Sequence, residues 1–143
     1  MQIFITGTLL ETAQDLDPRR LWKQILEVNQ IISTISGISS AWKNHPCIIQ
    51  YQQYLTWLEN YRDTLIHFRE GNIRGAELSS IQGELHKPIF HTPEFLDQMK
   101  RRLYTKDPSF YSKWSYLGKS DENWYWCWKE KKFIKYINGR KKT

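Results

Sequence analysis

The sequence is poor in several features that would assign it to particular protein classes. Its 143 residues include two cysteines, Cys47 and Cys127, seven glycines and five prolines. No run of 18 apolar residues occurs, and no basic stretch followed by an apolar run opens the chain, so we expect neither a membrane span nor export. We expect a cytoplasmic protein with free thiols, because a chain with a sufficient core and no secretory signal does not need a disulfide.

Familiar catalytic and metal-binding patterns are also missing. The sequence has no Gly-rich phosphate loop, no nucleophile elbow and no Cys-x-x-Cys pair. Its four histidines, His45, His67, His86 and His91, lack the spacing of a zinc site. We therefore predict no metal and no cofactor.

Aromatic residues and positive charge are abundant, and they coincide. Residues 1–99 hold eight Lys and Arg against eleven Asp and Glu, a net charge of −3, whereas residues 100–143 hold thirteen against four, a net charge of +9. Residues 100–143 also hold eleven of the 21 Phe, Trp and Tyr. Basic side chains attract phosphates and flat rings stack on bases, so this segment indicates a nucleic-acid partner. The alternative is a solvated basic tail beside an aromatic core, with the rings of residues 124–128 as core or oligomer contacts.

Capping signals and hydrophobic periodicity predict three helices. Their starts are marked by Asp17-Pro18, His45-Pro46 and Thr92-Pro93, where a capping or turn residue precedes proline. The first helix is expected to end before Gly37, the second and longest before Gly71, and the third after Leu103.

The remaining segments are predicted to be mostly irregular. Residues 72–91 show no sustained periodicity, so we expect a loop with at most one short helical turn. The ring-rich residues 124–137 favour a small C-terminal β-hairpin, with a helix as the alternative. The expected fold is mainly α, a compact three-helix single domain of residues 1–143 with long loops.

A cluster of cations opens the first predicted helix. Arg19, Arg20 and Lys23 lie in its first turns, where the helix dipole makes cations slightly unfavourable, so another factor favours them. Helical spacing puts them on one face with Glu27. A solvated face with a Lys23–Glu27 ion pair is the plain interpretation.

The order of these segments resembles the pyrimidine-dimer DNA glycosylase family of the phage endonuclease V type. The resemblance rests on a short N-terminal segment, the helix entry Leu16–Lys23, the loop Trp42–His45, and the aromatic run from Pro108 to Lys119. It covers the chain to about Lys119. Residues 120–143 form a basic, aromatic extension beyond it.

The resemblance implies a repair-type glycosylase with AP lyase activity on damaged or modified DNA. Such enzymes flip a nucleotide out of the duplex, cleave its glycosidic bond and nick the strand by β-elimination. Their nucleophile is the N-terminal α-amine, here that of Met1, because bulky Gln2 is expected to prevent removal of the initiator methionine. An α-amine has a reference pKa of about 7.7–8.0, so a useful fraction is unprotonated near neutrality.

The resemblance also implies a catalytic glutamate directly after the helix arginine, and Arg20 occupies that position. A guanidinium does not serve as a general base or stabilise a cationic sugar. Either Glu27, Asp17 or Asp15 has taken the role, or the protein no longer cleaves and binds DNA, RNA or a small nucleotide, as a phage or defence accessory. The residues expected to contact nucleic acid are Arg19, Arg20, Lys23, His45, Phe110, Tyr111, Lys113, Trp114, Tyr116 and Lys119.

Overall fold

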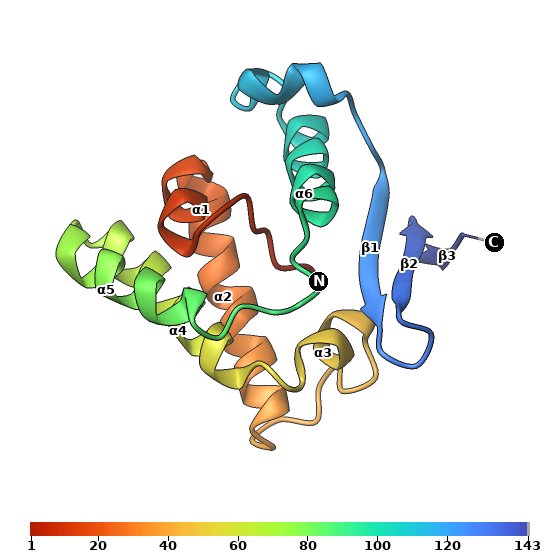
Figure 1. Ribbon diagram of the computed structural model, residues 1–143, viewed down its shortest axis with the longest axis horizontal. Coiled ribbons are helices and arrows are strands. Elements are labelled where there is room, and N and C mark those ends of the chain that lie inside the picture. The colour runs from red at the N-terminus through yellow and green to blue at the C-terminus, as the bar shows by residue number, and fades with distance from the viewer. Residues whose placement is uncertain (143) are drawn as a thin grey trace. The chain divides into compact units, whose positions relative to one another are not determined.

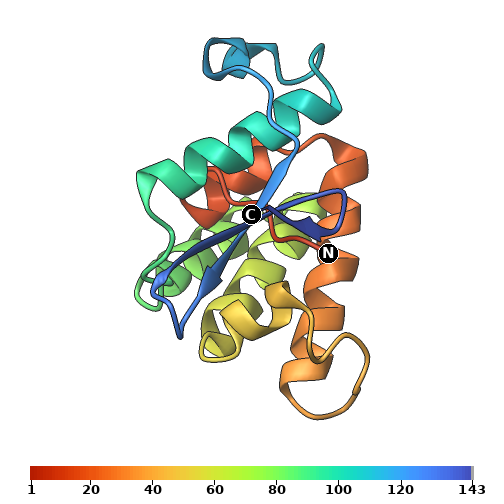
Figure 2. The same ribbon diagram turned by 90° about the vertical axis from the view of Figure 1, so that its right-hand side faces the viewer.

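The structure, a computed structural model, describes residues 1–142 and is mainly helical (Figures 1 and 2). In this part of the chain the elements, in order, are α1 (Leu9–Asp15), α2 (Pro18–Ile35), α3 (Pro46–Tyr51), α4 (Leu55–Arg69), α5 (Ile73–Glu84), α6 (Pro93–Lys106), the 3₁₀ helix η1 (Ser112–Leu117), β1 (Glu122–Cys127), β2 (Lys132–Ile137) and β3 (Arg140–Lys141). The chain divides into two compact units, an N-terminal unit of Met1–Ile89 and a C-terminal unit of Phe90–Thr143. Each unit is described by itself.

Helix α2 begins and ends where the sequence predicts. The Asp17 side chain accepts a hydrogen bond from the Arg20 backbone N–H at 3.3 Å, and Pro18 occupies the first turn. Gly37 follows the helix with a φ of +81°, a left-handed conformation that glycine adopts without a Cβ penalty. The buried stripe of α2 is the face on which the N-terminal segment lies. Its members are Leu21, Gln24, Ile25, Val28, Ile31 and Thr34.

The long second helix of the prediction is wrong, because the chain forms two helices, α3 and α4. Between them the backbone forms a turn, in which Tyr54 N–H donates a hydrogen bond to Tyr51 C=O at 2.9 Å. The break places the rings of Tyr51 and Trp57 parallel, 5.5 Å apart between centroids, and Trp57 lies 5.2 Å from Tyr61. All three rings are fully buried. The aromatic packing compensates for the interrupted helix, and the apolar periodicity continues through the break.

The predicted loop at residues 72–91 is also wrong, because residues 73–84 form α5. Asn72 caps this helix by accepting a hydrogen bond from Gly75 N–H at 3.0 Å. Its buried residues are small, namely Ala76, Ser80 and Gly83. Small residues let helices approach closely but give no apolar stripe, so hydrophobic periodicity does not find such a helix.

Helix α1 was not predicted either, and it packs on α5. Thr8 and Glu11 form a capping box, in which each side chain accepts a hydrogen bond from the other residue's backbone N–H. Leu10 N–H, one of the amides that a helix start leaves free, donates to Ser80 Oγ of α5 at 3.0 Å. The close packing of α1 on α5 thus includes a polar contact as well as apolar ones.

The C-terminal unit contains the predicted α6 and the predicted hairpin, and the hairpin gains a third strand. The antiparallel order is β1-β2-β3, and Glu122 pairs with Ile137 in the first ladder. Rings from α6 and the sheet form the core of the unit, with Phe95 stacked on Phe133 at 5.2 Å and Trp124 5.5 Å from Phe133. Trp124 of the tryptophan-rich strand β1 therefore belongs to the core of this unit. No helix in residues 1–142 is long and apolar enough to cross a membrane.

Gly83→Ala is expected to destabilise the N-terminal unit. A Cβ at this position would collide with the buried side chain of Leu9 and lie 3.2 Å from Asn60 Cβ. Overpacking costs about 1–3 kcal/mol, and the better helix propensity of alanine offsets about 1 kcal/mol of it. We expect the free energy of unfolding in urea to fall by up to about 2 kcal/mol. Gln82→Ala, at an exposed site of the same helix, should change it by less than about 0.5 kcal/mol; equal values for both variants would contradict this packing.

Candidate active site

The N-terminal segment of the chain is fixed along α2 by side chains rather than by a neighbouring strand. Gln24, which is buried, accepts a hydrogen bond from Phe4 N–H at 2.8 Å and donates to Gln2 C=O at 3.0 Å. One turn further along α2, Glu27 Oε2 accepts from Gln2 N–H at 3.1 Å. The amide of Gln24 thus pairs with one backbone N–H and one backbone C=O, as a neighbouring β-strand would. The Glu27 carboxylate binds the first peptide N–H of the chain.

Two further buried groups complete this attachment. The Tyr61 hydroxyl of α4 lies 2.7 Å from Phe4 C=O and 2.9 Å from Gln24 Oε1. Burial raises the pKa of Tyr61 well above its ordinary value, and the charge of Glu27 raises it further, so the hydroxyl keeps its proton. The backbone of Ile3 forms a hydrogen bond with the thiol of Cys47. Consecutive backbone N–H groups of residues 2, 3 and 4 therefore each meet a side chain of the helices.

The thiol of Cys47 lies among charged groups but is itself inert. Burial raises the pKa of Cys47 to about 12, while the positive N-terminus lowers it and Glu27 raises it. Both charges therefore lie near the sulfur. A thiol with so high a pKa stays protonated at neutral pH and does not serve as a nucleophile. Both cysteines are free, as predicted.

His45 is held in its neutral form at the start of α3. Its Nδ1 accepts a hydrogen bond from Cys47 N–H at 3.0 Å, which caps the helix and places the ring proton on Nε2. Burial lowers the pKa of His45, and the positive charge of the N-terminus lowers it further. The positive charge of the Met1 amine therefore acts on the imidazole.

These contacts gather three groups around the start of the chain, namely the Met1 α-amine, the Glu27 carboxylate and the His45 imidazole. The amine belongs to the residue before Gln2, whose N–H binds Glu27, and its charge acts on both His45 and Cys47. An amine can attack an electrophilic carbon, and an adjacent carboxylate can stabilise positive charge on that carbon's substituents. The arrangement suits chemistry through an N-terminal imine.

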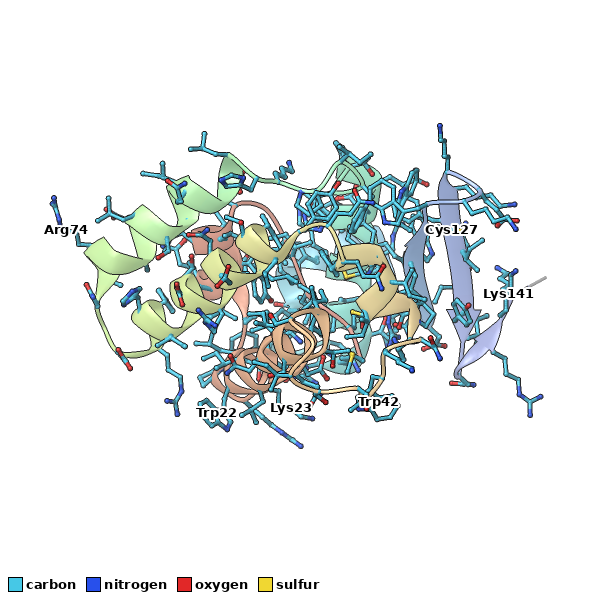
Figure 3. The ribbon with its side chains drawn as sticks, turned by 90° about the horizontal axis from the view of Figure 1, so that it is seen from below. Trp22, Lys23, Trp42, Arg74, Cys127 and Lys141 are labelled. Carbon is cyan, nitrogen blue, oxygen red and sulfur yellow. The ribbon has the colours of Figure 1, made fainter. Side chains whose placement is uncertain are left out.

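The other acids and cations near the start of α2 have different surroundings. Asp17 caps α2 and pairs with Arg20 at 3.1 Å, while Asp15 accepts a hydrogen bond from the Thr6 hydroxyl at 2.7 Å. Arg19 and Lys23 are exposed, and their spacing of four places them on the helix face that carries Glu27. Lys23 projects outward in Figure 3. Glu27 instead accepts its hydrogen bond from the first peptide N–H of the chain, that of Gln2.

The predicted nucleic-acid segment of residues 110–119 includes η1 in the C-terminal unit. Tyr111 is fully buried and stacks on the nearly buried Trp114 at 5.5 Å, and the Lys113 ammonium lies 4.7 Å from the centre of the Trp114 ring. The rings left exposed are Phe110 and Tyr116. Lys119 is also exposed. Tyr111 and Trp114 of the aromatic run are thus part of the core, and Phe110 and Tyr116 remain accessible to a partner.

Sequence reasoning missed four residues of this region: Gln24, Cys47, Tyr61 and Trp42. Gln24 offered a signal, since it is a polar residue on the apolar stripe of α2. Trp42 belongs to the loop Trp42–His45 that carries part of the resemblance, but the sequence does not report its exposure or its φ of +62°. Its ring lies 6.2 Å from that of His45, edge to face. A bulky side chain at positive φ costs of order 1–3 kcal/mol, which neighbouring contacts must offset.

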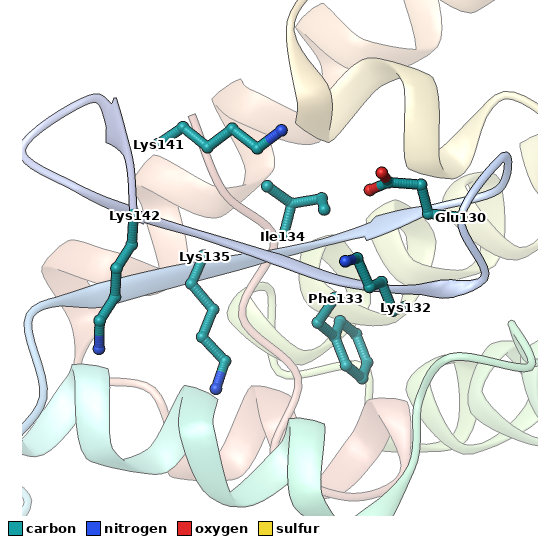
Figure 4. A pocket seen from close by; sticks show the side chains of 7 residues that line it. All are labelled: Glu130, Lys132, Phe133, Ile134, Lys135, Lys141 and Lys142. Atoms are coloured by element: carbon teal, nitrogen blue, oxygen red, sulfur yellow. The ribbon is translucent and has the colours of Figure 1, made fainter.

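A basic groove forms a second candidate site, in the C-terminal unit. The pocket, of about 450 Å³, lies along β2 and β3 (Figure 4). Its lining residues are Glu130, Lys132, Phe133, Ile134, Lys135, Lys141 and Lys142. Lys135 lies over the Trp124 ring at 4.5 Å and Lys142 pairs with Glu122 at 2.8 Å, so these two lysines also support the sheet. The groove is suited to anions.

Comparison with known proteins identified a family for the N-terminal part of the chain. The sequence model of one family, described as pyrimidine dimer DNA glycosylase, matches residues 1–79, which is 79 of the 143 residues. The matched residues lie within the N-terminal unit and include Met1, Glu27 and His45. No curated protein and no solved structure matches the chain. Within residues 1–142, no group of three or more His, Cys, Asp or Glu side chains is arranged to hold a metal ion.

His45→Asn is expected to weaken the acid sensitivity of the N-terminal unit. The folded-state pKa of His45 lies below its ordinary value of 6.5, so the unfolded chain binds the proton first as pH falls. The stability from the neutral ring is therefore complete above about pH 6.5 and declines below it. Asparagine retains a capping oxygen that does not titrate. Thermal unfolding midpoints should fall less in the variant than in the native protein between about pH 7.5 and about pH 5.

The control for this measurement is His86→Asn, which removes an exposed histidine from the same unit. Its midpoints should follow those of the native protein at both pH values. An unaltered pH dependence in His45→Asn would show that the capping histidine does not control acid stability.

Proposed function

Because the chain belongs to the pyrimidine dimer DNA glycosylase family, we propose that it is a DNA glycosylase with AP lyase activity that uses the Met1 α-amine as nucleophile and Glu27 as the essential carboxylate. The single observation that carries this proposal is the hydrogen bond from Gln2 N–H to Glu27 Oε2, at 3.1 Å. It sets a carboxylate beside the amine. The substrate class is DNA with a damaged or modified base.

The proposed reaction begins when the unprotonated amine attacks C1′ of an extruded nucleotide. The bond from C1′ to the base breaks, and the base leaves with the electron pair and takes up a proton. The C1′–O4′ bond then opens, O4′ gains a proton and the amine loses its own, which forms the imine. Loss of a C2′ proton expels the 3′ phosphate, and water hydrolyses the imine to restore the amine.

Glu27 is suited to the charge that this sequence develops. The sugar becomes positive as the base departs, and a carboxylate at that point stabilises the cation. Arg20, which stands where the resemblance implied the acid, pairs with Asp17 instead. The acidic role is therefore assigned to Glu27 in the middle of α2, two turns beyond Arg20.

His45 supports the same site as a neutral group. Its Nδ1 is engaged by Cys47 N–H, so its Nε2–H is a donor, and a lowered pKa keeps the ring from adding a second positive charge beside the amine. We assign it the role of a hydrogen-bond donor to the sugar or to an adjacent phosphate.

Contacts to the DNA backbone are proposed from both units. Arg19 and Lys23 are exposed on the face of α2 that carries Glu27. Residues 1–89 hold eight Lys and Arg against nine Asp and Glu, a net charge of −1, while residues 90–143 hold thirteen against six, a net charge of +7. Most of the electrostatic attraction to a polyanion thus comes from the C-terminal unit, with Phe110 and Tyr116 as exposed rings.

Glu27→Gln tests the catalytic proposal. The amide keeps an oxygen for Gln2 N–H but loses the negative charge, so cleavage of dimer-containing duplex should fall at least about 100-fold. Borohydride trapping on abasic DNA should be less affected, because no base has to leave. Asp17→Asn is the matched control, since asparagine also caps a helix, and it should cleave within about two-fold of the native protein.

Two results would contradict this assignment. One is an Asp17→Asn variant as impaired as Glu27→Gln. The other is the absence of any borohydride adduct from native protein whose intact mass shows Met1 as the first residue. A residue added before Met1 should also abolish the adduct, because the α-amine would be displaced.

The salt dependence of binding tests the role of the basic groove. Lys132→Gln with Lys141→Gln removes two exposed cations of the groove. If both contact phosphates, the slope of log binding constant against log salt on duplex DNA should shrink in magnitude by up to about 1.8. Arg74→Gln with Lys87→Gln removes two exposed cations of the N-terminal unit and should leave the slope at its native value. Similar slopes for the two double variants would place the contacts elsewhere.

A further inference from the structure

Trp42 is an exposed indole in the loop that leads to the candidate active site. Of its side-chain and backbone surface, 62% is accessible to solvent. The adjacent Lys43 and Asn44 are exposed as well. Tryptophan is enriched at surfaces where a partner covers the apolar part of its ring.

The backbone presents this indole in a fixed and unfavourable conformation. Trp42 has a φ of +62°, in the left-handed region that bulky residues avoid. Two hydrogen bonds hold the loop on either side of it, from the Thr34 hydroxyl to Ala41 C=O at 2.8 Å and from His45 N–H to Trp42 C=O at 2.8 Å. The loop backbone that carries the ring is therefore fixed on both sides of Trp42.

The indole of Trp42 contacts the ring of His45, a residue of the candidate active site. It meets the His45 imidazole edge to face, with 6.2 Å between the centroids and an interplanar angle of 82°. His45 in turn senses the charge of the Met1 amine. An aromatic side chain at this place can reach the base stack next to the nucleotide whose sugar the amine attacks.

We infer that Trp42 inserts into the DNA base stack and fills the gap left by the extruded nucleotide. This inference rests on the proposed function. Extrusion costs a few kcal/mol in lost stacking and pairing, and an inserted ring recovers part of the stacking. Because every base has a π-face, such a ring requires no particular sequence. Trp42 is thus a positioning residue that favours the extruded state.

The second exposed tryptophan of the N-terminal unit provides a matched control. Trp22 is 44% exposed, and both indoles project outward in Figure 3. Trp22, however, packs under the Arg69 guanidinium, 4.5 Å from the ring centre. It therefore already has a partner for its ring face, on α4.

The test compares borohydride trapping rates on an abasic site in duplex DNA and on the same strand without its complement. The missing base leaves a gap in an ordered base stack only in the duplex, so an inserted ring should matter only there. Trp42→Ala should lower the ratio of duplex to single-strand rates at least about ten-fold, and Trp42→Phe should lower it less because a phenyl ring still stacks. Trp22→Ala should keep the native ratio. A native ratio in Trp42→Ala, or an equal loss in Trp22→Ala, would overturn the inference.

A binding measurement separates this inference from the proposed chemistry. In a duplex with 2-aminopurine beside an abasic site, an indole inserted into the gap stacks on the probe and quenches its fluorescence. Native protein should quench the probe and Trp42→Ala should not, whether or not an adduct forms. Equal fluorescence with both proteins at saturation would overturn the inference. A missing adduct with the quenching difference intact would instead overturn the proposed catalysis and leave Trp42 as a stacking residue.

Discussion

The structure around the N-terminus depends on hydrogen bonds between side chains of α2 and the first backbone groups of the chain. A chain end ordinarily frays, because it has few partners. Here Gln24 supplies both a donor and an acceptor, and Glu27 accepts from the N–H of Gln2. Tyr61 closes the network from α4. The position of the Met1 amine follows from these contacts, and so does its relation to Glu27 and His45.

The same contacts satisfy the hydrogen-bonding groups of the polar side chains on the inner face of α2. Gln24 lies on an apolar stripe, where an unpaired amide would be costly, and each of its polar atoms has a partner. Glu27 lies at the edge of that stripe and is half-buried. Its hydrogen-bond partner is the backbone N–H of Gln2. The acid that the resemblance located next to the helix arginine is absent, but the geometry offers another beside the amine. This arrangement supports the proposed catalytic role of Glu27.

The sequence allowed part of this to be predicted, and the reasons differ from element to element. Helix α2, α6 and the hairpin follow from caps, apolar periodicity and ring-rich composition, which are local signals. Helix α5 buries Ala76, Ser80 and Gly83, so its stability comes from close packing that no local pattern reports. The break after Tyr51 depends on ring stacking between two helices. Glu27 was one of three candidate acids, and choosing it required knowing which one meets Gln2.

Cys47 has a consequence for the selectivity of the site toward carbonyl compounds. A sugar aldehyde reacts with thiolates as well as with amines, and the sulfur lies near both the amine and Glu27. With a pKa of about 12 and no exposed surface, this thiol is withheld from the aldehyde and from oxidants and alkylating agents. In the proposed reaction, addition to the sugar is therefore left to the amine nitrogen, and it gives an imine that water can hydrolyse.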